Sequence, residues 1–216
     1  MNAVTLGTRM LVLVLLPALV SCGDGGTVGN PQTTAVNWHP QMEQSGRSGL
    51  VEGAVAELVR YPEGISFQLT TEGLTPGNAY TLWLVVINSP EACESNPCTP
   101  PEALQLSETD SQVLFAGGEI AGGSRGTFAG SAEVGSLEGW LPDRSLVDSL
   151  AAEVWLVVND HGPALDEFMP GMINSYRGGC SDDSPFPPIF PDTALGDGES
   201  GPNTCLLYQV AIFLVP

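Results

Sequence analysis

The chain has 216 residues, with 25 acidic residues against six basic ones and a formal net charge of −19. All six basic residues are arginine, which excludes Schiff-base chemistry and a phosphate-binding loop that needs a lysine. An acidic excess of this size disfavours nucleic acid as a partner. Because 43% of the residues are apolar and only 14% are charged, we expect a folded core and not a disordered acidic tail.

The first 22 residues have the order of features found in an export signal. Arg9 precedes an apolar run at residues 10–16 that is too short to span a bilayer. Leu19-Val20-Ser21-Cys22 resembles the lipobox of bacterial lipoprotein precursors. This resemblance implies that residues 1–21 are a cleaved signal peptide and that Cys22 is acylated. We therefore expect a lipid-anchored, extracytoplasmic protein of the cell envelope, at the outer membrane or cell surface. In lipoproteins of bacteria with two membranes, Asp after the cysteine is typical of inner-membrane retention, and this chain has Gly23 there.

The segment after the lipobox differs in composition from the rest of the chain. Residues 22–34 are rich in Gly and lack an apolar period, so they predict a flexible tether before a single domain at 35–216. The four cysteines that follow Cys22 in an exported chain predict disulfides. Three pairings are possible. Cys93–Cys98 with Cys180–Cys205 is favoured because both bonds would close loops rich in Pro, Ser, Asp and Gly.

Strand-length apolar segments recur along the domain, separated by Gly, Pro, Asn and Asp. Residues 80–87 and 153–158 are apolar on both faces, which is typical of central strands. A helical signal is confined to residues 143–150. This pattern predicts an all-β fold, an antiparallel Greek-key β-sandwich of about seven or eight strands with at most one short helix. The expected strands are residues 54–60, 65–70, 80–87, 113–120, 128–134, 153–158 and 206–215.

Three short segments also carry a family resemblance. They are LTPGNAYTLW at 74–83, NSPEAC at 88–93 and DHGP at 160–163. With these segments, residues 49–215 resemble an uncharacterised family of exported bacterial β-sandwich proteins and, more distantly, the chordin-type (CHRD) repeats. The resemblance implies a fold and a location, and it assigns no catalytic residue.

Polar residues at the end of the apolar segment 153–158 form a candidate site. Asp160 and His161, followed by Asp166 and Glu167, could bind a divalent metal or another ligand, or titrate near neutral pH. The alternative is a turn in which these polar side chains bond to their own backbone.

Two further patterns have both a chemical and a structural interpretation. The segment GGSRG at 122–126 matches the G-x-S-x-G elbow of hydrolases, but the strand pattern after it favours a hairpin turn. The acidic loop 181–203 offers carboxylates for Ca²⁺ and a Pro-rich, aromatic centre for a partner, or it packs back on the core.

The composition favours a binding or interaction module of the envelope over an enzyme. Two histidines and no lysine leave few groups for catalysis, so we assign no catalytic residue, no cofactor and no metal ligand. The expected contacts are the membrane, through the lipid anchor alone, and an envelope protein or glycan. The sequence indicates no oligomeric state. The alternative is a metal-dependent or hydrolytic envelope enzyme that uses His161 and nearby carboxylates.

Overall fold

The computed structural model describes residues 29, 31–136, 140–141, 145–185 and 199–216. The predicted signal peptide, Cys22, most of the predicted tether, the start of the 143–150 segment and the centre of the 181–203 loop lie outside the described residues. No helix in the described ranges is long and apolar enough to cross a membrane. The strands are β1 (Gln32–Trp38), β2 (Leu50–Tyr61), β3 (Gly64–Thr71), β4 (Asn78–Ile87), β5 (Ser111–Ile120), β6 (Gly126–Glu133), β7 (Trp140–Leu141), β8 (Glu153–Pro163) and β9 (Leu206–Phe213).

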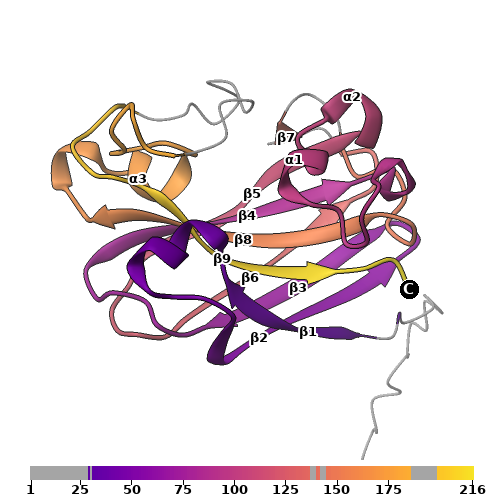
Figure 1. The fold of residues 1–216 in the computed structure, drawn as a ribbon, viewed down its shortest axis with the longest axis horizontal. Helices are drawn as coiled ribbons and strands as arrows, with labels where there is room; N and C mark the ends of the chain where they lie inside the picture. The colour runs from indigo at the N-terminus through magenta and orange to yellow at the C-terminus, as the bar shows by residue number, and fades with distance from the viewer. Residues whose placement is uncertain (1–28, 30, 137–139, 142–144, 186–198) are drawn as a thin grey trace, which may run out of the picture.

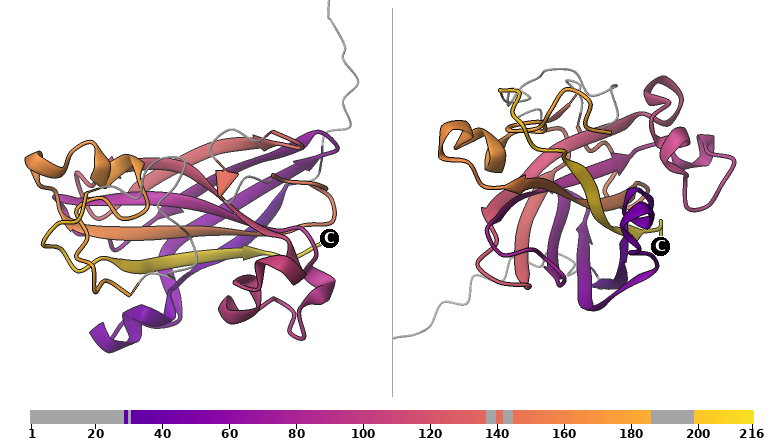
Figure 2. Two further views of the ribbon diagram at one scale, coloured as in Figure 1. Left: turned by 90° about the horizontal axis from the view of Figure 1, so that it is seen from above. Right: turned by 60° about the vertical axis from the view of Figure 1, so that its left-hand side comes forward.

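These strands form one antiparallel sheet in the order β6-β3-β2-β1-β9-β8-β4-β5-β7 (Figure 1). The sheet is curled, so that the half containing β6, β3, β2 and β1 packs against the half containing β9, β8, β4 and β5 (Figure 2). The predicted antiparallel all-β class is confirmed. The two layers of the sandwich are the two halves of a single continuous sheet.

All seven predicted strands are present, and the described residues add β1 and the two-residue β7. The domain boundary needs a correction, because the sequence places Gln32, Thr33 and Thr34 in the tether. They pair with residues 56–58 of β2 and belong to the sheet. Strand β1 lies between β2 and β9, so its backbone groups bond to both neighbours. Tertiary pairing therefore overrides a weak local signal.

The helices are short and lie outside the segment where one was predicted. Residues 145–150 contain no helix, and the Asp148 carboxylate accepts the Leu150 N–H at 2.9 Å in a turn. Helix α1 begins at Pro100, preceded by Thr99, whose N–H donates to Glu102 Oε2 at 2.7 Å. Proline in the first turn and this capping bond favour a helix start here. The described helices are α1 (Pro100–Ala103), α2 (Leu106–Thr109), α3 (Gly171–Asn174) and the 3₁₀ turns η1 (Pro40–Ser45), η2 (Pro90–Ala92) and η3 (Asp166–Phe168).

Two apolar layers explain why β4 and β8 are apolar on both faces. Leu82 and Leu84 of β4 point into the core between the two halves of the sheet. Trp83 of β4 and Trp155 of β8 point the other way, into a second cluster that also contains Tyr176 and both disulfides. The outer face of this half of the sheet is therefore covered by α1 and residues 175–180 instead of water.

Candidate ligand-binding site

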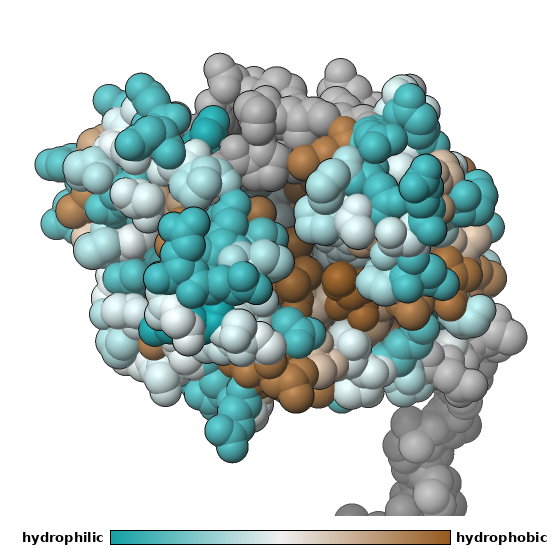
Figure 3. Space-filling view, in the orientation of Figure 1, coloured by the Kyte–Doolittle hydropathy of each residue, from teal (hydrophilic) through white to brown (hydrophobic). Residues whose placement is uncertain are grey.

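A pocket of about 330 Å³ lies in this outer layer, over β4, β5, β8 and β9. Figure 3 shows hydrophobic residues gathered in a hollow on the same face. Its volume is near the lower end of the range of about 300–1,000 Å³ typical of small-molecule sites. The described residues that line it are Asn37, Trp38, His39, Pro40, Trp83, Val85, Pro100, Ala103, Leu104, Val113, Trp155, Val157, Asn159, Tyr176, Leu207, Val210 and Ile212.

Strand alternation places the aromatic floor of the pocket. Trp83 pairs with Val157 across β4 and β8, and Trp155 is two residues before Val157 on the same face of β8. Tyr176 packs edge-on against Trp83, with ring centroids 5.0 Å apart. The floor is therefore a set of aromatic rings and branched aliphatic side chains.

Both floor tryptophans have a partner for their indole N–H within the protein. Trp83 Nε1 donates to Thr81 Oγ1 at 2.9 Å, and Trp155 Nε1 donates to Glu153 Oε1 at 2.6 Å. Glu153 is itself buried, and burial raises its pKa. Because these N–H groups are already bonded, the rings offer a ligand their apolar surface.

Asn159 is the exception among the polar groups of the floor. Its side chain is fully buried, and neither Nδ2 nor Oδ1 has a hydrogen-bond partner. Among the described residues, the one other buried side-chain atom of this kind is Gln112 Oε1. A register shift between β8 and β9 falls between Val158 and Asn159, and such irregularities re-aim side chains. An unpaired buried polar group costs about 1–3 kcal/mol of stability, so this amide lowers the stability of the sheet.

One wall of the pocket is a braced loop. The Cys93–Cys98 disulfide closes it, and Cys98 N donates to the buried Glu153 Oε1 at 3.2 Å. Glu102 accepts hydrogen bonds from the backbone N–H of residues 94, 95 and 99. These bonds and that of the Thr99 hydroxyl lower the pKa of Glu102 to about 2. The loop thereby fixes α1, which supplies Pro100 and Ala103 to the lining.

Among the described residues that line the pocket, none is charged at neutral pH. His39 forms part of the opposite wall, and burial lowers its pKa to about 4. Burial also raises the pKa of Tyr176, so its hydroxyl stays protonated. The pocket is therefore suited to an uncharged molecule.

The structure places His161 beneath this pocket and not in an open site. Its side chain is fully buried; Nε2 lies 2.8 Å from Thr81 Oγ1, and Nδ1 lies 2.9 Å from the Gly178 carbonyl oxygen. A carbonyl only accepts, so Nδ1 carries the proton, Nε2 accepts from Thr81, and Thr81 accepts from Trp83. Burial lowers the pKa of His161 to about 4. The imidazole therefore positions the Trp83 indole through Thr81.

The other three predicted site residues lie apart from His161. The Asp160 carboxylate accepts from Asn78 Nδ2 at 3.0 Å and from the Gly162 N–H at 2.8 Å, and burial raises its pKa. Asp166 and Glu167 are exposed on η3. The structure does not assemble the four residues into one ligand set, and the Asp160 bond to Gly162 is of the local backbone kind that the turn interpretation expected.

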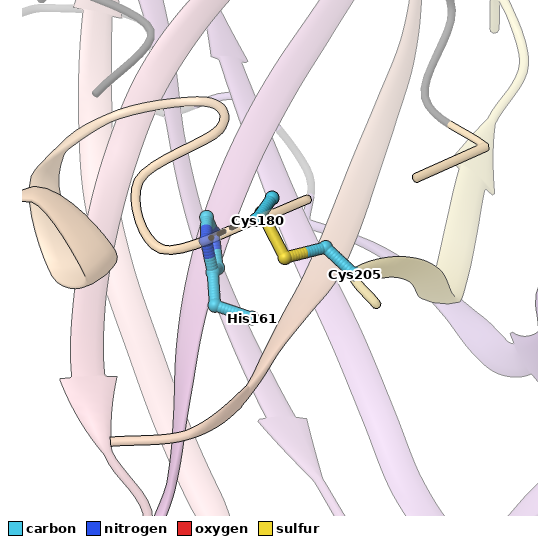
Figure 4. Close-up of side chains that lie close together, drawn as sticks. All are labelled: His161, Cys180 and Cys205. Carbon is cyan, nitrogen blue, oxygen red and sulfur yellow. Dashed lines mark hydrogen bonds between the residues drawn. A yellow bond between two sulfur atoms is a disulfide. The ribbon is translucent and has the colours of Figure 1, made fainter. Parts of the chain in front are cut away.

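Both predicted disulfides, Cys93–Cys98 and Cys180–Cys205, are confirmed. In the described residues, the one group of three metal-capable side chains is His161, Cys180 and Cys205, whose ligand atoms lie within 4.8 Å of one another (Figure 4). The two sulfurs are bonded to each other, so neither offers a thiolate to a metal. The group instead joins residues 178–180 to the outer layer.

Residues 121–125 connect β5 to β6, and the Ser124 carbonyl accepts the Leu74 N–H at 3.0 Å. The G-x-S-x-G segment therefore forms a turn between two strands, without the helix that a nucleophile elbow requires.

Sequence reasoning missed Asn159, Trp83 and Trp155 as site residues. The available signal was an amide that directly follows the apolar run EVWLVV, on a strand apolar on both faces. The predicted site residues Asp160 and His161 lie one and two positions further along the chain. Comparisons of this chain with protein-family models, with curated proteins and with solved structures each find no significant match.

Proposed function

We propose that this chain is a lipid-anchored, extracytoplasmic binding module of the cell envelope whose pocket binds a small, uncharged, mostly apolar molecule. The observation that carries the binding role is the apolar pocket of about 330 Å³, whose floor is formed by Trp83, Trp155 and Tyr176. A glycan would bring many hydroxyl groups to a lining that offers few polar partners. A small apolar ligand is therefore the better match.

The envelope location is supported by the lipobox-like residues 19–22 and by the disulfides, which are typical of an oxidising compartment. Strand β1 begins at Gln32, ten positions after Cys22. A Gly-rich tether of that length, if it were a random coil, would have a root-mean-square reach of about 17 Å. An acylated Cys22 would hold the domain close to the bilayer surface.

The binding role can be tested with N-phenyl-1-naphthylamine, a neutral dye whose fluorescence rises in apolar surroundings. The full chain in nanodiscs is titrated with the dye, and empty nanodiscs correct for partition into lipid. We expect a saturable site with one dye per chain. Val210→Trp, which fills the pocket from β9, should remove it. Val55→Trp, on the exposed face of β2, is the matched control and should keep it.

Dye signal no greater than that of empty nanodiscs would contradict the binding role. The anchor is tested separately by labelling cells with a radioactive fatty acid. Cys22→Ser should lose the label and the membrane association, whereas Ser21→Ala should keep both. A Cys22→Ser chain that still takes up the label would contradict the lipid anchor.

A further inference from the structure

One end of the sheet carries a group of exposed apolar side chains beside the start of β1, and we propose that this end of the domain rests on the surface of the bilayer that holds the anchor. The group consists of Val147, Leu150, Leu214 and Val215, which form the apolar rim. The inference rests on the proposed lipid anchor at Cys22 and goes beyond it, because an anchor alone leaves the domain free to take any orientation.

The hydrogen bonds of Arg60 hold two parts of the apolar rim together. Its guanidinium donates to the carbonyls of Ser149 and Ala152, which flank Leu150 in the chain. The same group donates to the carbonyl of Leu214 at 3.3 Å. The rim side chains are between 41% and 59% exposed, so much of their apolar surface faces water in the free domain.

Val147 lies at the same end of the sheet. Its N–H donates to Asn88 Oδ1 at 2.9 Å, directly after β4 ends at Ile87. Among the described residues, four of the seven exposed large hydrophobic side chains therefore belong to this end. Single exposed apolar side chains are common on protein surfaces, whereas a group of them marks an interaction site.

The chain enters the sheet at the apolar rim. Gln32 is the first residue of β1, and its Nε2 donates to the Leu214 carbonyl at 3.2 Å. Figures 1 and 2 show the start of β1 and the C-terminus at the same end of the molecule. Cys22 lies ten positions before Gln32. An acylated Cys22 would therefore hold the rim closer to the bilayer than the opposite end of the sheet.

The opposite end carries fewer exposed apolar side chains and lies further from the anchor. Leu50 pairs with Asn37 near the end of β1. Ile120 pairs with Ala79 near the start of β4. Strand β2 joins the two ends over 12 residues, about 36 Å at about 3.3 Å per residue. A ten-residue random coil has a root-mean-square reach of about 17 Å, so contact through the opposite end would need a nearly extended tether.

The proposed contact is apolar and not electrostatic. Asp148 lies within the rim and is exposed, and Glu91 and Glu94 line a hollow together with Leu214 and Val215. These carboxylates repel anionic lipid, so the rim side chains have to supply the attraction. Because the anchor keeps the rim at a high local concentration beside the bilayer, a contact too weak to hold a free domain is sufficient.

Paramagnetic broadening of methyl NMR signals measures this contact. The acylated chain is placed in phosphatidylcholine nanodiscs whose lipid carries a nitroxide on the acyl chain. We expect the methyl signals of the four rim residues to broaden several-fold more than those of Leu50 and Ile120 at the opposite end.

A pair of double variants separates a bilayer contact from nearness to the anchor. Leu150→Ser with Leu214→Ser removes half of the rim, and the broadening of the Val147 and Val215 signals should then fall several-fold. Leu50→Ser with Ile120→Ser is the matched control and should leave that broadening unchanged. All four positions are exposed, so both variants should fold, and their urea unfolding midpoints check this.

Equal broadening of Val147 and Val215 in wild type and in the rim variant would overturn this inference and leave the lipid anchor standing. Broadening that increases when phosphatidylglycerol, an anionic lipid, is added would overturn it too, because such a contact would be electrostatic. A wild-type chain that takes up no fatty-acid label would overturn the proposed anchor itself.

Discussion

Asp160 and His161 are neighbours in the chain, yet their side chains lie on opposite faces of β8. Asp160 bonds to Asn78 and lies 3.3 Å from the hydroxyl of Tyr80, which belongs to the inner core. His161 lies 2.8 Å from Thr81 in the outer layer. The two-residue period of a strand separates them. They therefore serve two separate hydrogen-bond networks, one beside the core and one beneath the pocket.

The buried imidazole makes stability depend on pH in a defined direction. The pKa of His161 is about 4 in the folded chain and about 6.5 when unfolded. Between these pH values the unfolded state binds the proton more readily. The contribution of the neutral imidazole to the unfolding free energy is therefore at its maximum above pH 6.5. It is lost as pH falls towards 4. A shift of this size corresponds to about 3 kcal/mol.

The quantity to measure is the difference in unfolding free energy between wild type and His161→Gln. We expect this difference to rise by about the same amount between pH 4 and 6.5 and to stay level above pH 7. Urea unfolding at several pH values measures it. The difference isolates His161, because His39, Asp160 and Glu153 are present in both proteins and their own pKa shifts cancel. A difference that does not change with pH would contradict the assigned burial.

Most core substitutions destabilise a protein, but substitution of Asn159 should stabilise this one. Asn159→Leu removes an amide that has no partner in the free protein, so it should raise the unfolding free energy by about 1–2 kcal/mol. Asn88→Leu is the matched control. Asn88 donates to the carbonyls of Asp110 and Ser145 and accepts from the Val147 N–H, so its loss should destabilise the chain by a similar amount. Destabilisation by both substitutions would indicate that ordered water pairs with Asn159.

Features of the fold that depend on local sequence patterns could be predicted, whereas those that depend on contacts between distant segments could not. The strands at 80–87 and 153–158 were predicted as central because both faces are apolar, and α1 and residues 175–180 cover their outer face. The disulfides follow from cysteine count and loop composition. Strand β1 was missed in part because its pairing with β2 and β9 is non-local.

The candidate site was harder to predict, because it depends on which polar groups are already bonded. Asn159 is unpaired since Thr81, 78 positions earlier in the chain, is engaged by Trp83 and His161. No local pattern contains this information. With Thr81 turned towards Asn159, the same residue types in a strand would pair the amide.

The buried Arg60 side chain joins distant segments of the described chain through hydrogen bonds to an amide and to backbone carbonyls. It donates to Gln32 Oε1 at 2.6 Å and to the carbonyls of Ser149, Ala152 and Leu214 at 2.6, 2.8 and 3.3 Å. Burial lowers its pKa to about 10, so it stays charged at neutral pH. Arg60→Ala should lower the unfolding free energy by about 3 kcal/mol or more, because several buried carbonyls lose their donor.

Arg125 is the control for this substitution. Its side chain is 65% exposed and lies 3.4 Å from Glu72. Exposed ion pairs contribute little, so Arg125→Ala should change the unfolding free energy by about 0.5 kcal/mol or less in urea unfolding. Equal losses for the two arginines would show that the carbonyl cluster around Arg60 does not hold these segments together.

The two disulfides should differ in their effects on stability and on binding. Cys93–Cys98 spans five positions and Cys180–Cys205 spans 25, so loop-closure entropy predicts losses of about 2 and about 3–4 kcal/mol when each pair is changed to serine. The shorter bond braces the α1 wall of the pocket. For each kcal/mol of unfolding free energy lost, removing Cys93–Cys98 should therefore weaken dye binding several-fold more than removing Cys180–Cys205. Urea unfolding and dye titration of the two double-serine variants measure both effects, and a common ratio of binding loss to stability loss would show that α1 is positioned without the Cys93–Cys98 bond.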